Sequence, residues 1–118
     1  MKISDILSIL DAQLLTEGAG LEREVHTACG SDMMSDVLAY VKDQSVLLTG
    51  LVNSQVVRTA EMMDMVCIVF VRGKRPDEQI LSLARQRGIA VLSTPYRMFT
   101  ACGLLYDNGL KGGCETDV

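Results

Sequence analysis

A run of six apolar residues at positions 66–71 (VCIVFV) constrains the fold more than any other feature of the chain. It is short and rich in β-branched residues, which favours a strand over a helix. A strand with no polar face must be buried on both sides, as the central strands of parallel sheets are. We therefore expect helices on the two faces of a parallel sheet.

The rest of the chain repeats a strand–turn–helix pattern around this run. We expect further strands over 24–29, 45–49 and 89–92. The first helix is expected from Ser4, the second from residue 33 through Val41, and the third from Asn53 or Ser54 through Asp64. The fourth is expected from Pro76 to Gly88. The last is expected from Pro95 to Asn108, with Thr94 as its cap. Leu38 and Phe99 belong to the apolar stripes expected to face inward.

These elements predict a single three-layer α/β/α domain with a mainly parallel sheet. The domain is expected over residues 1–110, followed by a loose tail over 111–118. At 118 residues and 48% hydrophobic content, the chain can bury a substantial core.

Composition argues against several classes of partner and cofactor. The net charge of −4 disfavours a nucleic-acid partner. No stretch approaches the ~18 apolar residues of a membrane span, and the N-terminus lacks a signal-peptide pattern, so we expect a cytoplasmic protein. The four cysteines, of which Cys114 lies in the tail, form no CxxC pair. They are expected to be free thiols, with no metal site and no cofactor.

No catalytic motif is recognisable, and the chain is not expected to be an enzyme. Gly73-Lys74 is followed by Arg75, which breaks the phosphate-loop pattern of a kinase. A Cys–His pair is disfavoured because His26 and Cys29 lie in opposite phase on the expected strand.

Ligands of open parallel sheets bind at the carboxyl ends of the strands, where three turns are expected to meet. Their candidate ligand-binding residues are Thr49, Gly50, Asn53, Ser54, Arg72, Gly73, Lys74, Ser93 and Thr94. Backbone N–H groups at helix N-termini and the basic side chains would suit an anionic small molecule or a nucleotide. In the alternative interpretation the hydroxyls only cap helices and the basic run is a solvated loop.

Methionines are frequent, at seven in the chain. Adjacent pairs such as Met62-Met63 and Met33-Met34 cannot both face inward from a surface helix. We therefore expect some exposed methionine surface and a homodimer.

Several segments resemble the DRTGG domain family, among them SDMMSDVLAYV, LLTGL and, most specifically, GIAVLSTPYRMF. The N-terminal part is similar to the N-terminal domain of HPr kinase, and the family also includes the middle domain of phosphotransacetylase. The sequence departs from the motif that names the family. Val52-Asn53 stand at the Asp-Arg positions, and Val71-Arg72-Gly73 at Thr-Gly-Gly, so only the last glycine is kept.

The resemblance implies a layered α/β fold and an accessory role. Such domains occur within phosphotransacetylases, between the CBS domains of a pyrophosphatase, and beside hydrogenase or NADH-oxidising complexes. The leading hypothesis is thus a non-catalytic regulatory module for an anionic metabolite, and the alternative is a protein-interaction subunit of such a redox complex.

Overall fold

The computed structural model describes residues 1–18, 20–40 and 44–113. Five strands form one sheet in the order β1-β5-β4-β3-β2. They are β1 (Gln13–Leu14), β2 (Thr27–Gly30), β3 (Ser45–Thr49), β4 (Cys67–Phe70) and β5 (Ala90–Ser93). All neighbours are parallel except β1, which runs antiparallel to β5 at one edge. The prediction of a mainly parallel sheet is confirmed.

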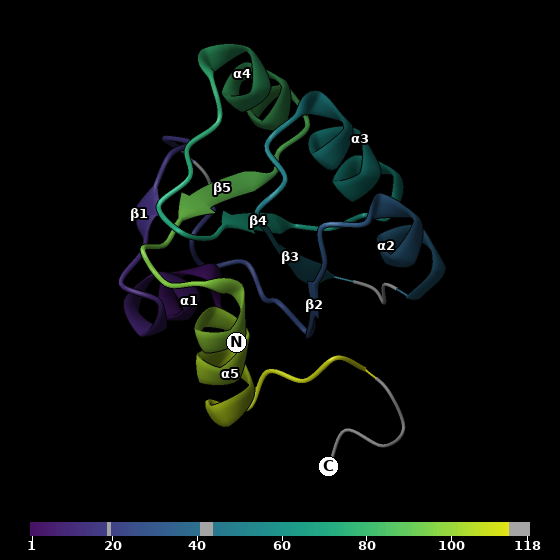
Figure 1. Ribbon diagram of the computed structural model, residues 1–118. Helices are drawn as coiled ribbons and strands as arrows, with labels where there is room; N and C mark the ends of the chain where they lie inside the picture. Colours follow the sequence, from purple (N-terminus) through teal and green to yellow (C-terminus); the bar gives the residue numbers. More distant parts are fainter. Residues whose placement is uncertain (19, 41–43, 114–118) are drawn as a thin grey trace.

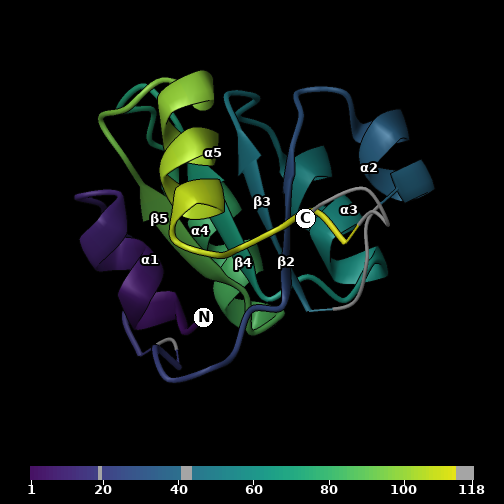
Figure 2. The same ribbon diagram turned by 90° about the horizontal axis from the view of Figure 1, so that it is seen from below.

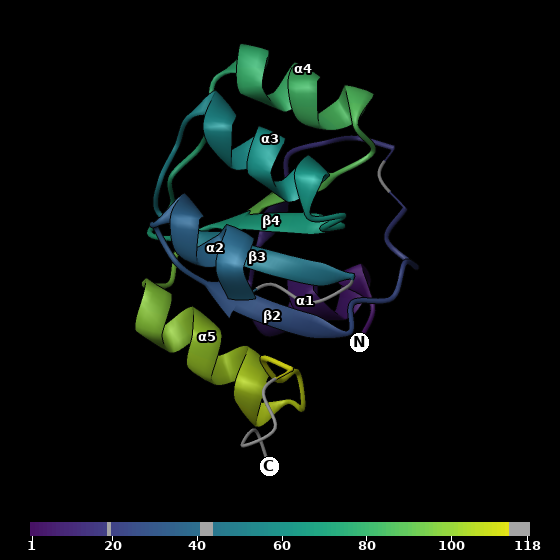
Figure 3. The same ribbon diagram turned by 90° about the vertical axis from the view of Figure 1, so that its right-hand side faces the viewer.

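Five helices cover the two faces of this sheet. They are α1 (Ile3–Ile9), α2 (Met34–Tyr40), α3 (Ser54–Met62), α4 (Glu78–Gln86) and α5 (Met98–Asp107). Helices α2, α3 and α4 lie on one face, and α1 and α5 lie on the other (Figures 1 and 3). Seen from below, α1 and α5 stand in front of the sheet (Figure 2). The three-layer α/β/α fold is therefore as predicted.

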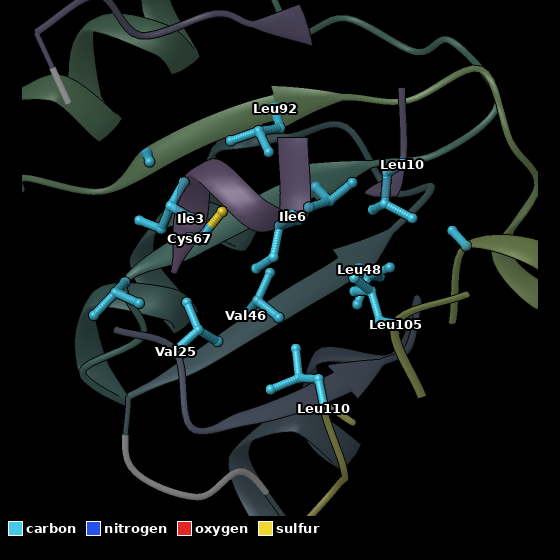
Figure 4. Packing of buried hydrophobic residues seen from close by; sticks show 14 of the residues in the cluster. Ile3, Ile6, Leu10, Val25, Val46, Leu48, Cys67, Leu92, Leu105 and Leu110 are labelled. Carbon is cyan, nitrogen blue, oxygen red and sulfur yellow. The ribbon is translucent and has the colours of Figure 1, made fainter. Parts of the chain in front are cut away.

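The core divides into two apolar layers, one on each side of the sheet. On β4, Cys67 and Val69 pack toward α1 and α5, whereas Ile68 and Phe70 pack toward the other helices. The first layer is shown in Figure 4, where Ile6 lies next to Val46 and Leu105 lies next to Leu48. The strand at 66–71 is buried on both faces, as its composition predicted.

The second strand begins later than expected. It was expected over 24–29, with Val25 and Cys29 on one face, but β2 begins at Thr27. The N–H of Val25 instead donates to the carbonyl of Met1, and Val25 packs in the α1/α5 layer while Cys29 packs in the opposite one. Pairing with the first residues of the chain thus takes this segment out of the strand.

Two helix starts also differ from expectation. The N-cap of α1 is Lys2, whose N–H donates to the Asp5 carboxylate, so Ser4 lies within the helix. The N-cap of α4 is Asp77, one residue after Pro76. Val41 lies outside the described residues, and Leu38, expected to face inward, is 45% exposed.

The last helix starts three residues later than predicted. Thr94 and Tyr96 cannot be helical, because their carbonyls accept the N–H groups of Gly73 and Arg72, at 2.7 and 2.8 Å. The chain therefore turns before α5, and Arg97 is the N-cap. The delay changes which side chains face the core, so Phe99 is 90% exposed instead of buried.

At the C-terminus, the carbonyl of Lys111 accepts the N–H of Ala28 on the outer edge of β2. Residues 111–113 form no helix or strand, and the remainder of the expected tail, 114–118, lies outside the described residues. Among the described residues, no helix is long and apolar enough to cross a membrane. Met33 and Met62 are 62% and 71% exposed, which confirms the expected methionine surface.

Candidate functional site

The turns that follow β3, β4 and β5 meet at one edge of the sheet (Figure 3). The β4 turn is joined to the β5 turn by the bond from the Gly73 N–H to the Thr94 carbonyl. It is joined to the β3 turn by Lys74, whose Nζ donates to the Gly50 carbonyl at 2.9 Å. The sequence-based expectation that these three loops share one rim is therefore confirmed by the geometry.

A carboxylate that the sequence-based site did not include lies at the β3 end of this rim. The Oδ1 atom of Asp32 accepts the Gly50 N–H at 2.7 Å and the Thr49 hydroxyl at 2.9 Å. The Thr49 oxygen in turn accepts the N–H of Leu51 at 3.1 Å. An anionic oxygen is thus already held by two donors at the end of β3.

The environment of Asp32 favours its charged form. The backbone N–H of Gly50 lowers the pKa of this carboxyl below its usual value, helped by the Thr49 hydroxyl and by the charges of Arg72 and Lys74. Partial burial acts in the opposite direction but is outweighed. Asp32 follows β2 as the other site residues follow their strands, so its position after a strand was the available signal.

Arg72 lies directly over the backbone of Gly50. A Cβ atom placed on Gly50 would stand 2.9 Å from Nη2 of Arg72, too close for any other residue type without a shift. Arg72 itself has a φ of 61°, which is uncommon outside glycine, and its N–H donates to the Tyr96 carbonyl. Gly50 therefore makes room for the guanidinium beside Asp32.

Two of the predicted site residues face elsewhere. Asn53 is the N-cap of α3, with its side chain accepting the N–H of Val56 at 3.2 Å. With Ser54 it lines a separate depression of 640 Å³ between α3 and α4, whose wall also includes Arg58 and Asp77. The predicted nine-residue site is therefore divided between the rim and this groove.

The two hydroxyls at the end of β5 hold loops together. Ser93 Oγ donates to the Lys74 carbonyl at 2.8 Å, and Thr94 Oγ1 donates to the Leu10 carbonyl at 2.7 Å. Both residues are buried. Thr94 is consequently not the cap of α5. Because both hydroxyls are used in bonds to backbone carbonyls, these bonds favour a structural role over direct contact with a ligand.

The cysteines lie on separate elements. Burial raises the pKa of Cys67 to about 12, and it also raises the pKa values of Cys29 and Cys102. Exposed His26 lies beside α1 in another depression, and Cys114 falls outside the described residues. Within the described ranges, no three His, Cys, Asp or Glu side chains gather closely enough to hold a metal ion.

Comparison of this chain with known proteins identifies a matching family and a solved structure of similar fold. The DRTGG domain model matches residues 5–107. A solved structure with a TM-score of 0.74 and 20% identity contains the CBS and DRTGG domains of the regulatory region of Clostridium perfringens pyrophosphatase, in complex with the activator diadenosine tetraphosphate. The match covers 88% of this chain and 45% of that one, so this chain spans less than half of its structural neighbour. A search of curated proteins found no match.

The family model covers most of the chain, and the solved structure independently shows the same fold. Together with the parallel sheet and the loops at its edge, these matches establish that the chain belongs to the DRTGG domain family.

Proposed function

We propose that this chain is a non-catalytic regulatory module that binds an anionic metabolite, with a nucleotide as the leading candidate, at the carboxyl ends of its parallel strands. The observation that carries the proposal is the cluster in which Gly50 and Thr49 donate to one anionic oxygen. A phosphate oxygen and a carboxylate oxygen accept hydrogen bonds of the same kind.

Positive charge at the rim supports this proposal. Arg72 and Lys74 are exposed, and their positive charges both help to lower the pKa of Asp32. A guanidinium recognises phosphate with paired donors, and the ammonium adds a point charge. Two cations beside one internal carboxylate leave a local excess of positive charge for a ligand, although the whole chain carries −4.

Asp32 defines how the ligand binds. A phosphate oxygen that takes the two donors from Gly50 and Thr49 must displace the carboxylate of Asp32, because both donors converge on its Oδ1 atom. Removing the Asp32 charge should therefore raise the affinity for a phosphate ligand. The regulatory region of the structural neighbour was solved with a dinucleotide activator, which makes nucleotides the first ligands to test.

The test is isothermal calorimetry and thermal shift with inorganic phosphate, AMP, ATP and diadenosine tetraphosphate. A ligand present at 100 times its Kd should add ~2.7 kcal/mol of stability. We expect Arg72→Ala to weaken binding about tenfold or more, as expected for loss of a hydrogen-bonded charge. Asp32→Asn should strengthen it.

Arg58→Ala is the matched control, because Arg58 lines the groove between α3 and α4 and not the rim. Loss of binding in Arg58→Ala with normal binding in Arg72→Ala would place the ligand in that groove and contradict the proposed location. Absence of binding by all four ligands would contradict the proposed function itself.

The alternative role, as an interaction subunit of a hydrogenase or NADH-oxidising complex, gains no support from the comparisons. Neither the family match nor the structural neighbour names such a complex. We therefore put forward the regulatory module alone.

A further inference from the structure

The connection from β2 to α2 is tied to the end of β3 at two points. Ser31 donates its backbone N–H to the carbonyl of Leu48 at 3.0 Å. Asp32 accepts the N–H of Gly50 at 2.7 Å and the hydroxyl of Thr49 at 2.9 Å. In the part of the chain that the structure describes, no other side chain of this connection or of α2 forms a hydrogen bond to another element. Asp32 is therefore the polar side chain that anchors the beginning of α2.

Apart from this anchor, α2 is held mainly by the packing of two side chains. Met34 and Val37 are buried in the layer that α2 shares with α3 and α4. The helix lies at the end of that layer, with α3 as its neighbour (Figure 1). It has only seven residues, and helices shorter than about 12–15 residues have little stability of their own. Opening such an element locally requires less free energy than unfolding the whole domain.

A ligand at the rim removes the Asp32 anchor. This step rests on the proposed function, in which a phosphate oxygen takes the donors of Gly50 and Thr49 from the carboxylate. The displaced carboxylate then lies beside a second negative charge, and like charges a few ångströms apart repel each other. The phosphate also draws on Arg72 and Lys74, the two cations of the rim. Ligand and Asp32 thus compete for the same donors and the same positive charges.

We propose that Asp32 is an internal substitute for the ligand, and that ligand binding at the rim releases α2 from its place on the sheet. The free chain holds α2 through Asp32, and the liganded chain does not. A regulatory module needs a two-state element of this kind, whose equilibrium depends on the ligand. The coupling is reciprocal, so any change that loosens α2 also strengthens ligand binding.

The thiol of Cys29 on β2 reports whether α2 is in place. Its half-buried side chain packs against the layer that contains Met34 and Val37. Burial raises the pKa of this thiol, and smaller contributions come from Cys102 and from Asp36 on α2. Release of α2 removes this cover, so Cys29 should react faster with a maleimide. Cys102 packs in the layer on the other side of the sheet and serves as the internal reference.

The first experiment measures the ratio of the maleimide labelling rates of Cys29 and Cys102 in the full chain without ligand, by mass spectrometry of peptides. Asp32→Ala should raise this ratio about tenfold, as expected for the loss of hydrogen bonds to a charged group. Asp77→Ala is the matched control, because the Asp77 carboxylate accepts the N–H of Ile80 at 3.0 Å in α4, on the same face of the sheet. It should leave the ratio at the parent value. An unchanged ratio in Asp32→Ala, or an equal rise in Asp77→Ala, overturns the proposal.

The second experiment adds inorganic phosphate or ATP to the parent, at concentrations that saturate the chain in calorimetry. A bound ligand should raise the ratio for Cys29 and Cys102 as Asp32→Ala does, and it should raise the ratio of that variant little further. A ligand that binds without changing the ratio in the parent overturns the release of α2 and leaves the proposed binding site standing. Absence of binding by every ligand tested contradicts the proposed function, and this inference with it.

Reciprocity gives a third measurement, which needs no label. Val37→Ala weakens the packing of α2, so it should bind the same ligand about fivefold more tightly in calorimetry, at the lower end of known couplings. Leu105→Ala is the matched control, because this side chain is equally buried but belongs to α5 on the other face, and its affinity should equal that of the parent. A Val37→Ala variant with the affinity of the parent, or a weaker one, contradicts the coupling between α2 and the rim.

Discussion

Replacing Asp32 tests whether the rim is held together from within. In Asp32→Ala, the Gly50 N–H loses its acceptor, and the Thr49 hydroxyl loses one of its two contacts. An unpaired buried donor costs about 1–3 kcal/mol, and bonds to a charged group lie toward the upper end. Because Asp32 is exposed and water can partly replace it, we expect a loss of about 2 kcal/mol in the free energy of unfolding.

Asp32→Asn is the matched variant, since it keeps an oxygen acceptor and removes the charge. It should lose about half as much, because hydrogen bonds to a neutral acceptor are roughly half as strong. Urea denaturation at pH 7, with equal m values for parent and variants, measures both differences. An alanine variant within about 0.5 kcal/mol of the parent, the usual range for an ordinary surface site, would refute the reasoning.

The pH dependence of this difference has a definite sign. The pKa of Asp32 is lowered in the folded chain, mainly by the Gly50 N–H. Its contribution to stability is therefore complete above the unfolded pKa of about 3.9 and is lost as the pH falls through the folded pKa. The difference in the free energy of unfolding between the parent and Asp32→Asn should stay constant from pH 7 to about 5, because Asp32 is charged in both the folded and the unfolded chain over that range. It should shrink on further acidification. A difference that grows in acid would contradict the assigned contacts.

Three further predictions concern packing. Gly30→Ala should destabilise the fold by about 1–3 kcal/mol, because its Cβ would lie 2.7 Å from the Cys102 sulfur, and adding Cys102→Ala should recover most of that loss in thermal melts. Phe70→Ala should cost about 3–5 kcal/mol in urea denaturation, since this ring is fully buried; a loss under 1 kcal/mol would mean that the core collapses around it. Cys67 should resist a maleimide in the native state and react only in denaturant, because burial raises its pKa to about 12; mass spectrometry after brief labelling reads this out.

The sequence alone determined the layered fold. The run at 66–71 could be accommodated only as a strand covered on both faces, and the alternation of strands with capped helices then required parallel pairing. It also located the rim, because the carboxyl ends of parallel strands must lie at one edge. Local signals sufficed at Asn53, whose side chain caps the helix that follows it.

Only the tertiary structure decided how the residues of that rim are used. Asp32 reaches Thr49 across 17 positions, and Thr94 reaches Leu10 across 84, so no local pattern could reveal either bond. Two other long-range bonds, from the N–H groups of Gly73 and Arg72 to the carbonyls of Thr94 and Tyr96, delay α5, and Phe99 faces outward although its spacing favoured the core. Hydrophobic periodicity fixes which segments form strands and helices, whereas the partner of each polar group depends on which loops the completed sheet brings together.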